Sequence, residues 1–176
     1  LLGQGRSERA FALLERVQEG TPGDPMSGLL LAGRARREGD AARAEALYRA
    51  ILDHHPDQQQ ALLRLAHMEE GDGNAGQARK LLRRAVDAVP GAVRPRRALA
   101  HHYLRQGEPA EALTVVEQGL EQAPESRALA ELKGHAQLAL ERPSSAVTTF
   151  RELAERSPEA AGPRFLLGRA YLQADR

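Results

Sequence analysis

Three histidines recur at an interval of 34 residues: His67, His101 and His135. An imidazole can bind a metal ion, and its charge changes near pH ~6.5, so the series could form a metal site or a pH-sensitive surface. Several arginines stand close to these histidines in the sequence, and a guanidinium pairs with a carboxylate through two parallel hydrogen bonds. Arg97 and His101 are four residues apart. On a helix they lie one turn apart and can share one ligand.

The elements that must position these side chains follow the same 34-residue interval. Prolines recur with it at Pro22, Pro56, Pro90, Pro124 and Pro158. Alanines recur in step at Ala10, Ala44, Ala78, Ala112 and Ala146. Between prolines, apolar residues follow helical spacing, as in the series Ala78, Leu81, Leu82, Ala85 and Val86. A fixed period of this length with helical spacing inside it predicts stacked units of two helices, labelled A and B below.

A glycine is expected at the turn between the two helices, because glycine adopts positive φ without strain. The series is Gly5, Gly39, Gly73 and Gly107, and Glu141 stands where the fifth glycine would be. The opening residues 1–5 therefore look like the end of a helix and its turn. We expect the chain to be a fragment of a longer protein.

Several phrases resemble the tetratricopeptide repeat family. Phe165-Leu166-Leu167-Gly168-Arg169-Ala170-Tyr171 resembles the family's helix A motif, and Ala44-x-x-x-Tyr48 and Ala146-x-x-x-Phe150 resemble its helix B motif. The resemblance covers the whole chain and implies an all-α fold, a right-handed superhelical solenoid of antiparallel helix pairs. It divides the chain into a partial repeat 1–24, full repeats 25–58, 59–92, 93–126 and 127–160, and a partial repeat 161–176. Together these form one array.

Residues 127–172 also resemble bacterial envelope repeat lipoproteins of exopolysaccharide and PEP-CTERM sorting systems. That resemblance implies a periplasmic or envelope-anchored protein, with the lipid-bearing cysteine outside this sequence. The same repeat departs from the pattern at Lys133, where the other repeats carry leucine. We expect its stem to lie along the core with the amine in water, and a local shift in helix packing is the alternative.

In this family helix A lines an inner concave groove, and the resemblance implies which residues face it. They are Arg36, Arg64, His67, Arg94, Arg97, His101, Arg105, His135 and Arg169. The set is basic, which predicts binding of an acidic peptide or a terminal carboxylate. The lysine–asparagine clamp of some members is absent, because Arg97 and His101 occupy its positions in one repeat. The alternative is a solvated helix face whose arginines favour helix formation.

Other functions find little support in the residues. The chain of 176 residues carries a net charge of +1, which does not favour nucleic acid or a lipid surface. It has no cysteine, no apolar run near the ~20 residues that span a bilayer, and no catalytic or phosphate-loop motif. Stacked helices keep the histidines of successive repeats too far apart for one metal ion, so we expect no metal and no cofactor. The neighbours His54-His55 and His101-His102 are expected at the surface.

The sequence thus predicts a non-enzymatic scaffold that binds a partner protein or an extended peptide in a basic concave groove. The alternative is a regulatory or substrate-recruiting module of a larger enzyme. A further expectation is weak homodimerisation, because a repeat array cut inside its repeats leaves apolar ends uncovered.

Overall fold

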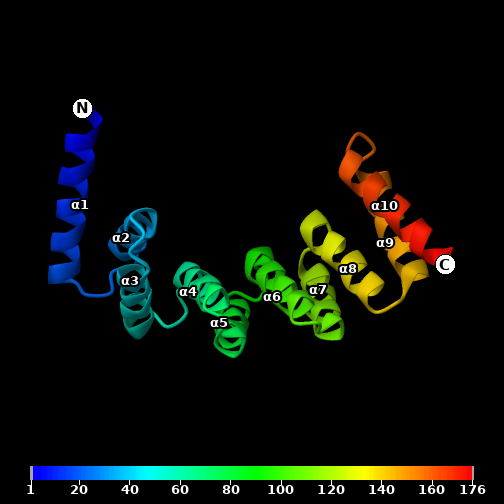
Figure 1. The fold of residues 1–176 in the computed structure, drawn as a ribbon, viewed down its shortest axis with the longest axis horizontal. Coiled ribbons are helices and arrows are strands. Elements are labelled where there is room, and N and C mark those ends of the chain that lie inside the picture. Colours follow the sequence, from blue (N-terminus) through cyan, green and yellow to red (C-terminus); the bar gives the residue numbers. More distant parts are fainter. Residues whose placement is uncertain (1, 176) are drawn as a thin grey trace. The chain divides into compact units, whose positions relative to one another are not determined.

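Ten α-helices, and no strands, make up the part of the chain that the structure describes (Figure 1). The computed structural model describes residues 2–175. The helices are α1 (Leu2–Gly20), α2 (Pro25–Arg37), α3 (Ala41–His54), α4 (Gln59–Gly71), α5 (Ala75–Ala88), α6 (Val93–Arg105), α7 (Pro109–Gln122), α8 (Arg127–Ala139), α9 (Pro143–Arg156) and α10 (Ala161–Ala174). The predicted all-α class of paired helices is confirmed.

The helix starts keep the 34-residue interval of the sequence. The A helices α2, α4, α6, α8 and α10 begin at residues 25, 59, 93, 127 and 161, and the B helices α3, α5, α7 and α9 begin at 41, 75, 109 and 143. Pro25, Pro109 and Pro143 are each the first residue of a helix. The first N–H of a helix has no intrahelical partner, so proline is tolerated there.

Two compact units divide the chain between Val89 and Pro90. In the first unit α1 packs on α2, α2 on α3, α3 on α4 and α4 on α5, while α2 also touches α4. In the second unit α6 to α10 pack in the same successive way, and α6 also touches α8. The A helices α2 and α4 of the first unit are therefore neighbours, as are α6 and α8 of the second, which brings the outward-facing side chains of each pair onto a shared side.

Small residues lie where the helices of one repeat cross. Ala44, Ala78, Ala112 and Ala146 of the B helices are fully buried. Ala32, Ala66, Ala100 and Gly134 of the facing A helices are buried too. Small side chains let two helix axes approach closely, and a bulky replacement would overpack the crossing by about 1–3 kcal/mol. Ala10 and Gly168 are the exposed members of these two series, because no described helix covers them.

Lys133 behaves as its position in the sequence suggests. Leu31, Leu65 and Leu99 are buried at the equivalent positions of the other repeats. The Lys133 side chain is partly covered, and its Nζ lies 3.6 Å from Oε1 of Glu117 on α7. The aliphatic stem thus stays on the core while the charge meets a carboxylate at the surface.

The turns confirm most of the glycine series and correct one member. Gly39, Gly73 and Gly107 have φ values of +83°, +80° and +72°. The expectation that Gly5 forms a turn is wrong, because α1 continues through it from Leu2 to Gly20. A turn needs a helix on each side. Here the residues before Gly5 satisfy their backbone groups by extending the same helix.

Glu141 occupies the glycine position of the last turn and is strained there. Its φ is +57°, and it is the only residue other than glycine with positive φ among residues 2–175. A side chain at positive φ costs of order 1–3 kcal/mol of strain. A glycine at the same position would remove this strain, but it would lose more conformational entropy on folding, so the net gain in stability is smaller. We expect Glu141→Gly to raise the free energy of unfolding by about 1 kcal/mol in denaturant titrations. The reciprocal control Gly107→Glu should lower it by a similar amount, and a destabilised Glu141→Gly would refute the assignment of strain.

His102 corrects a second expectation, because it is not at the surface. Its side chain is 0% exposed, and its ring lies edge-on to Tyr103 with centroids 6.1 Å apart. Neighbours on a helix diverge by ~100°, so His101 and His102 cannot share one face. Leu99 lies one turn before His102 on the buried face, whereas His101 is exposed.

Candidate functional site

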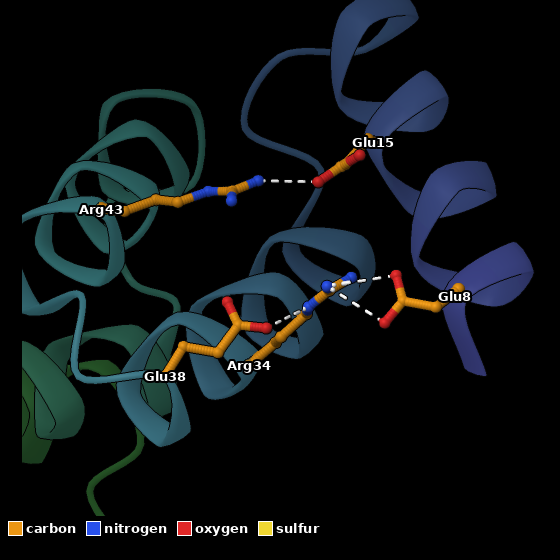
Figure 2. Close-up of polar contacts among 5 residues, drawn as sticks. All are labelled: Glu8, Glu15, Arg34, Glu38 and Arg43. Carbon is orange, nitrogen blue, oxygen red and sulfur yellow. Dashed lines mark hydrogen bonds and ion pairs between the residues drawn. The ribbon is translucent and has the colours of Figure 1, made fainter. Parts of the chain in front are cut away.

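Many arginines of the first unit form ion pairs within the fold. Figure 2 shows Arg34 of α2 between Glu8 of α1 and Glu38, with nitrogen–oxygen distances of 3.3 and 2.6 Å. It also shows Arg43 of α3 at 2.7 Å from Glu15 of α1. Arg34 lies over the Phe11 ring as well, 4.6 Å from its centroid. These arginines connect α1 to α2 and α3, so their charges are balanced inside the unit.

A deeper contact ties α3 to α4. Glu69 of α4 is only 7% exposed, and its two carboxylate oxygens accept hydrogen bonds from Arg49 at 3.1 Å and from Asn74 at 2.9 Å. Arg49 also pairs with Glu45 one turn earlier, which raises its pKa. The buried carboxylate is thereby satisfied, and this cluster is structural.

A different set of arginines surrounds a hollow between α2 and α4. The hollow has a volume of about 330 Å³. It is lined by Leu29, Gly33, Arg36 and Arg37 of α2, Tyr48 of α3, and Gln60 and Arg64 of α4. We call it the arginine hollow. The structure therefore brings together Arg36 and Arg64, which the sequence placed in the groove, and adds Arg37 to them.

The charges of the arginine hollow are not balanced within the fold. No acidic residue lines it. Within residues 5–175, none of the guanidinium groups of Arg36, Arg37 and Arg64 forms a hydrogen bond or an ion pair. Three cations around one concavity repel one another and attract an anion from solution. This distinguishes Arg36 from Arg34, two residues earlier on the same helix.

Sequence reasoning missed two residues of the hollow. Tyr48 holds the position that Phe150 holds in a later repeat. Because an apolar ring serves equally well there, the repeat pattern gave no reason to expect a role for the Tyr48 hydroxyl. Gly33 holds the position that His67, His101 and His135 hold in the following repeats. A Cβ added at Gly33 would meet nothing closer than Nη1 of Arg37, at 3.9 Å. The absence of a side chain at Gly33 leaves the hollow open. The sequence signal that could have identified this opening is the glycine itself, which stands where the following repeats carry histidine.

The other predicted residues are distributed over both units. His67 is exposed on α4 of the first unit, and Arg169 is exposed on α10 of the second. Four more lie on α6; they are Arg94, Arg97, His101 and Arg105, and all four are exposed. None of these residues lines the arginine hollow.

His135 differs from the two earlier members of its series. It is half-buried on α8, and its ring lies edge-on to Phe150 of α9 with centroids 5.8 Å apart. Burial lowers the pKa of His135, and the positive charge of Arg169 lowers it further, against a smaller opposite effect of Glu131. The structure thus brings His135 and Arg169 near each other, with the imidazole favoured in its neutral form.

This lowered pKa predicts a pH-dependent stability. Below the unfolded-state pKa of ~6.5 the unfolded chain binds a proton that folded His135 resists, so the free energy of unfolding falls as pH decreases and levels off below the folded pKa. We expect His135→Gln to remove this part of the decline in denaturant titrations between pH ~8 and pH ~5. His67→Gln, at an exposed position, is the control and should keep the wild-type profile. Parallel profiles for wild type and His135→Gln would exclude the effect.

Metal and membrane sites are not evident in the described chain. Among residues 2–175, no three histidine, aspartate or glutamate side chains come together in a way that could hold a metal ion. No described helix combines the length and apolar character required to cross a membrane. Exposed apolar residues do lie on the first and last helices, Leu13 and Val17 on α1 and Phe165 and Leu172 on α10. Weak self-association through these helices stays a prediction.

Comparison with known proteins places this geometry in a family context. One model of a tetratricopeptide repeat family matches residues 70–136, and a second matches residues 29–93 and 131–176. The second alone covers more than half of the chain. No curated protein sequence gives a significant match.

Solved structures give the same fold. The thermophilic TPR protein TTC0263 of Thermus thermophilus is 21% identical, with a TM-score of 0.65 over 98% of this chain and 94% of its own. YrrB, described as a TPR protein with an unusual peptide-binding site, is 15% identical, with a TM-score of 0.72 over 92% and 84%. A mutant O-GlcNAc transferase of Thermobaculum terrenum is 28% identical, with a TM-score of 0.61 over 74% of this chain and 25% of its own.

Proposed function

The chain belongs to the tetratricopeptide repeat family, and we propose that it is a non-enzymatic scaffold that binds an acidic segment of a partner protein on the A-helix side of its first unit. A role in protein interaction agrees with the fold and with structural neighbours such as YrrB. The acidic character of the partner is our inference from the charges.

The arginine hollow is the observation that carries this proposal. Arg36, Arg37 and Arg64 surround it without an acidic neighbour in its lining, whereas Arg34 and Arg43 nearby are already paired. A guanidinium binds a carboxylate through two parallel N–H donors, and the bond is stronger than one between neutral groups. An acidic side chain entering the hollow would therefore meet three cations and would displace no internal ion pair.

One further predicted residue of the first unit, His67, suits the flank of such a ligand. His67 is exposed on α4, the helix that carries Arg64. An extended peptide rises ~3.3 Å per residue, so a few residues suffice to reach from one A helix to its neighbour about 8–10 Å away. Charged groups of this kind accelerate encounter and select partners more than they add raw affinity.

Fluorescence anisotropy of a labelled peptide tests the proposal. The probe is a short peptide of alternating glutamate and leucine, and its control carries glutamine in place of every glutamate. We expect the acidic peptide to bind and the control not to bind, with affinity that falls as salt rises from ~0.1 M to ~1 M because exposed charges are screened. Equal binding of both peptides would refute the acidic preference, and binding of neither would refute the ligand class.

A second candidate is a recruiting module of a larger enzyme. The favouring observation is the match to the O-GlcNAc transferase structure, of which this chain covers only 25%. In that case the hollow would bind a substrate protein for a catalytic domain. The complete coding sequence separates the two candidates, since a catalytic domain in the same chain would favour the module.

We extend the proposal to a bacterial envelope setting, in which the partner takes part in exopolysaccharide assembly. The support is the resemblance of residues 127–172 to envelope repeat lipoproteins. Cell fractionation of the full-length protein tests this setting, and recovery in the cytoplasmic fraction alone would refute it.

A further inference from the structure

Tyr48 is the most deeply placed polar residue of the arginine hollow. It projects from α3, is 2% exposed, and nevertheless lines the hollow between α2 and α4. No group of residues 5–175 forms a hydrogen bond with its hydroxyl. The hydroxyl oxygen is not sealed from solvent, so it can donate to a ligand oxygen or a water molecule that enters the hollow.

The donors around Tyr48 outnumber the acceptors. Each guanidinium of Arg36, Arg37 and Arg64 carries about five N–H donors and no acceptor, and the amide of Gln60 adds about two donors. No carboxylate is present in the lining to use them. A fitting ligand group therefore offers several acceptor oxygens and negative charge at one point.

The amount of charge selects between the common biological anions. A single carboxylate supplies one negative charge and two oxygens, which leaves most of three cations unbalanced. A phosphate monoester carries about −1.5 to −2 at neutral pH and presents three strong acceptor oxygens. The absent side chain at Gly33 leaves space for such a tetrahedral group in a hollow of about 330 Å³.

We propose that the arginine hollow is a phosphate-monoester site, which takes a phosphorylated side chain of the partner, with Arg36, Arg37, Arg64 and the Tyr48 hydroxyl donating to the phosphoryl oxygens. This inference rests on the proposed function in one respect: the phosphate is carried by a peptide. The phosphoryl oxygens accept from the phenol at the floor and from the guanidinium groups at the rim. Partner binding then depends on phosphorylation.

The test compares three peptides that differ in one residue, which is phosphoserine, glutamate or serine within the same acidic sequence. We expect the phosphoserine peptide to bind about tenfold more tightly than the glutamate peptide, because it adds charge and acceptors at one point. Tyr48→Phe should reduce this preference several-fold. It removes one hydroxyl and keeps the ring, as Phe150 does in the later repeat, so its urea midpoint should stay near that of wild type.

Inorganic phosphate is the second probe, followed by NMR on the isotope-labelled chain. We expect shifts at Gly33, Tyr48 and Arg64 with phosphate and smaller shifts with acetate at the same ionic strength. Arg16→Gln, which removes an exposed cation of α1, is the matched control and should change neither measurement.

The outcomes separate this inference from the scaffold role. Equal affinities for the phosphoserine and glutamate peptides, unaffected by Tyr48→Phe, would overturn the phosphate site and leave the scaffold standing. Phosphate shifts at the hollow without binding of any peptide would support the site and refute the scaffold. Absence of shifts with phosphate, together with no preference for phosphoserine, would overturn the phosphate site as well.

Discussion

Reversal of two charges in the arginine hollow, Arg36→Glu with Arg64→Glu, is expected to weaken binding of the glutamate–leucine peptide by about 100-fold, or roughly 2.7 kcal/mol. The change removes two attractions and places two carboxylates beside an acidic ligand, and like charges facing each other across an interface cost several kcal/mol. The two side chains have no hydrogen-bond or ion-pair partner among residues 5–175, so the fold should keep its helical content and its unfolding midpoint. Anisotropy gives the affinity, and circular dichroism gives the fold.

The control for this variant changes the same net charge in the same unit. Arg9 and Arg16 are exposed on α1 and lie outside the lining of the hollow. Arg9→Glu with Arg16→Glu should weaken binding only slightly, because these charges act on the peptide from a distance and salt screens that interaction. If both double variants lose the same affinity, the peptide responds to overall charge and the arginine hollow is not its site.

A second large difference is expected between two glycines that hold the same place in successive repeats. A Cβ added at Gly134 would meet the ring of Phe150, with Cε2 at 2.8 Å and Cε1 and Cζ closer still. The ring is fully buried, so it can shift only by disturbing the core around it. A Cβ added at Gly168 meets nothing within 4 Å. Both glycines lie inside helices, where alanine is intrinsically better by ~1 kcal/mol.

We therefore expect substitutions of opposite sign. Gly168→Ala should raise the free energy of unfolding by about 0.5–1 kcal/mol. Gly134→Ala should lower it by about 2 kcal/mol, since overpacking exceeds the gain in helix propensity. Urea titrations of both variants measure the difference.

A smaller side chain at position 150 provides the companion test of the contact. Phe150→Leu should recover part of the loss when it is combined with Gly134→Ala, because the two residues are in direct contact. Stabilisation by Gly134→Ala, or additive effects in the double variant, would contradict the close contact between Gly134 and Phe150.

The paired-helix architecture was predictable because each repeat faces the same packing problem. The stripe from Ala78 to Val86 forms one buried face of α5, as its spacing indicated. Small residues recur at the helix crossings because a larger side chain would overpack them. Prolines recur outside helix interiors because proline lacks the N–H that an interior position must donate. Periodicity carries this information since it concerns residues close in sequence.

The site was less predictable because it depends on which charges are already paired. Arg34 and Arg36 are two residues apart, yet one binds Glu8 and Glu38 while the other faces the hollow. Part of the distinction comes from α1, whose Glu8 carboxylate reaches Arg34 on the side of α2 that faces α1 (Figure 2). The sequence identified Tyr48 only as part of a helix B motif, and the structure shows that its side chain is buried. The motif could not show that the same ring lines the hollow.

The errors have a common physical cause. The surface position expected of both His101 and His102 is wrong for His102, because a helix turns two neighbours to different faces and His102 falls on the buried one. The turn expected at Gly5 followed from its place in the glycine series, although α1 continues through it. In both cases the geometry of the individual helix, and not the expectation drawn from the sequence pattern, determined where the residue lies.

The central claim, that an acidic segment binds at the arginine hollow, is tested most directly by NMR chemical-shift mapping with the glutamate–leucine peptide. The claim predicts that the largest shifts fall on residues lining the hollow, such as Leu29, Gly33 and Gln60, and that α1 and α5 change little. Shifts centred on α1 or α5, or spread evenly over the first unit, would contradict it.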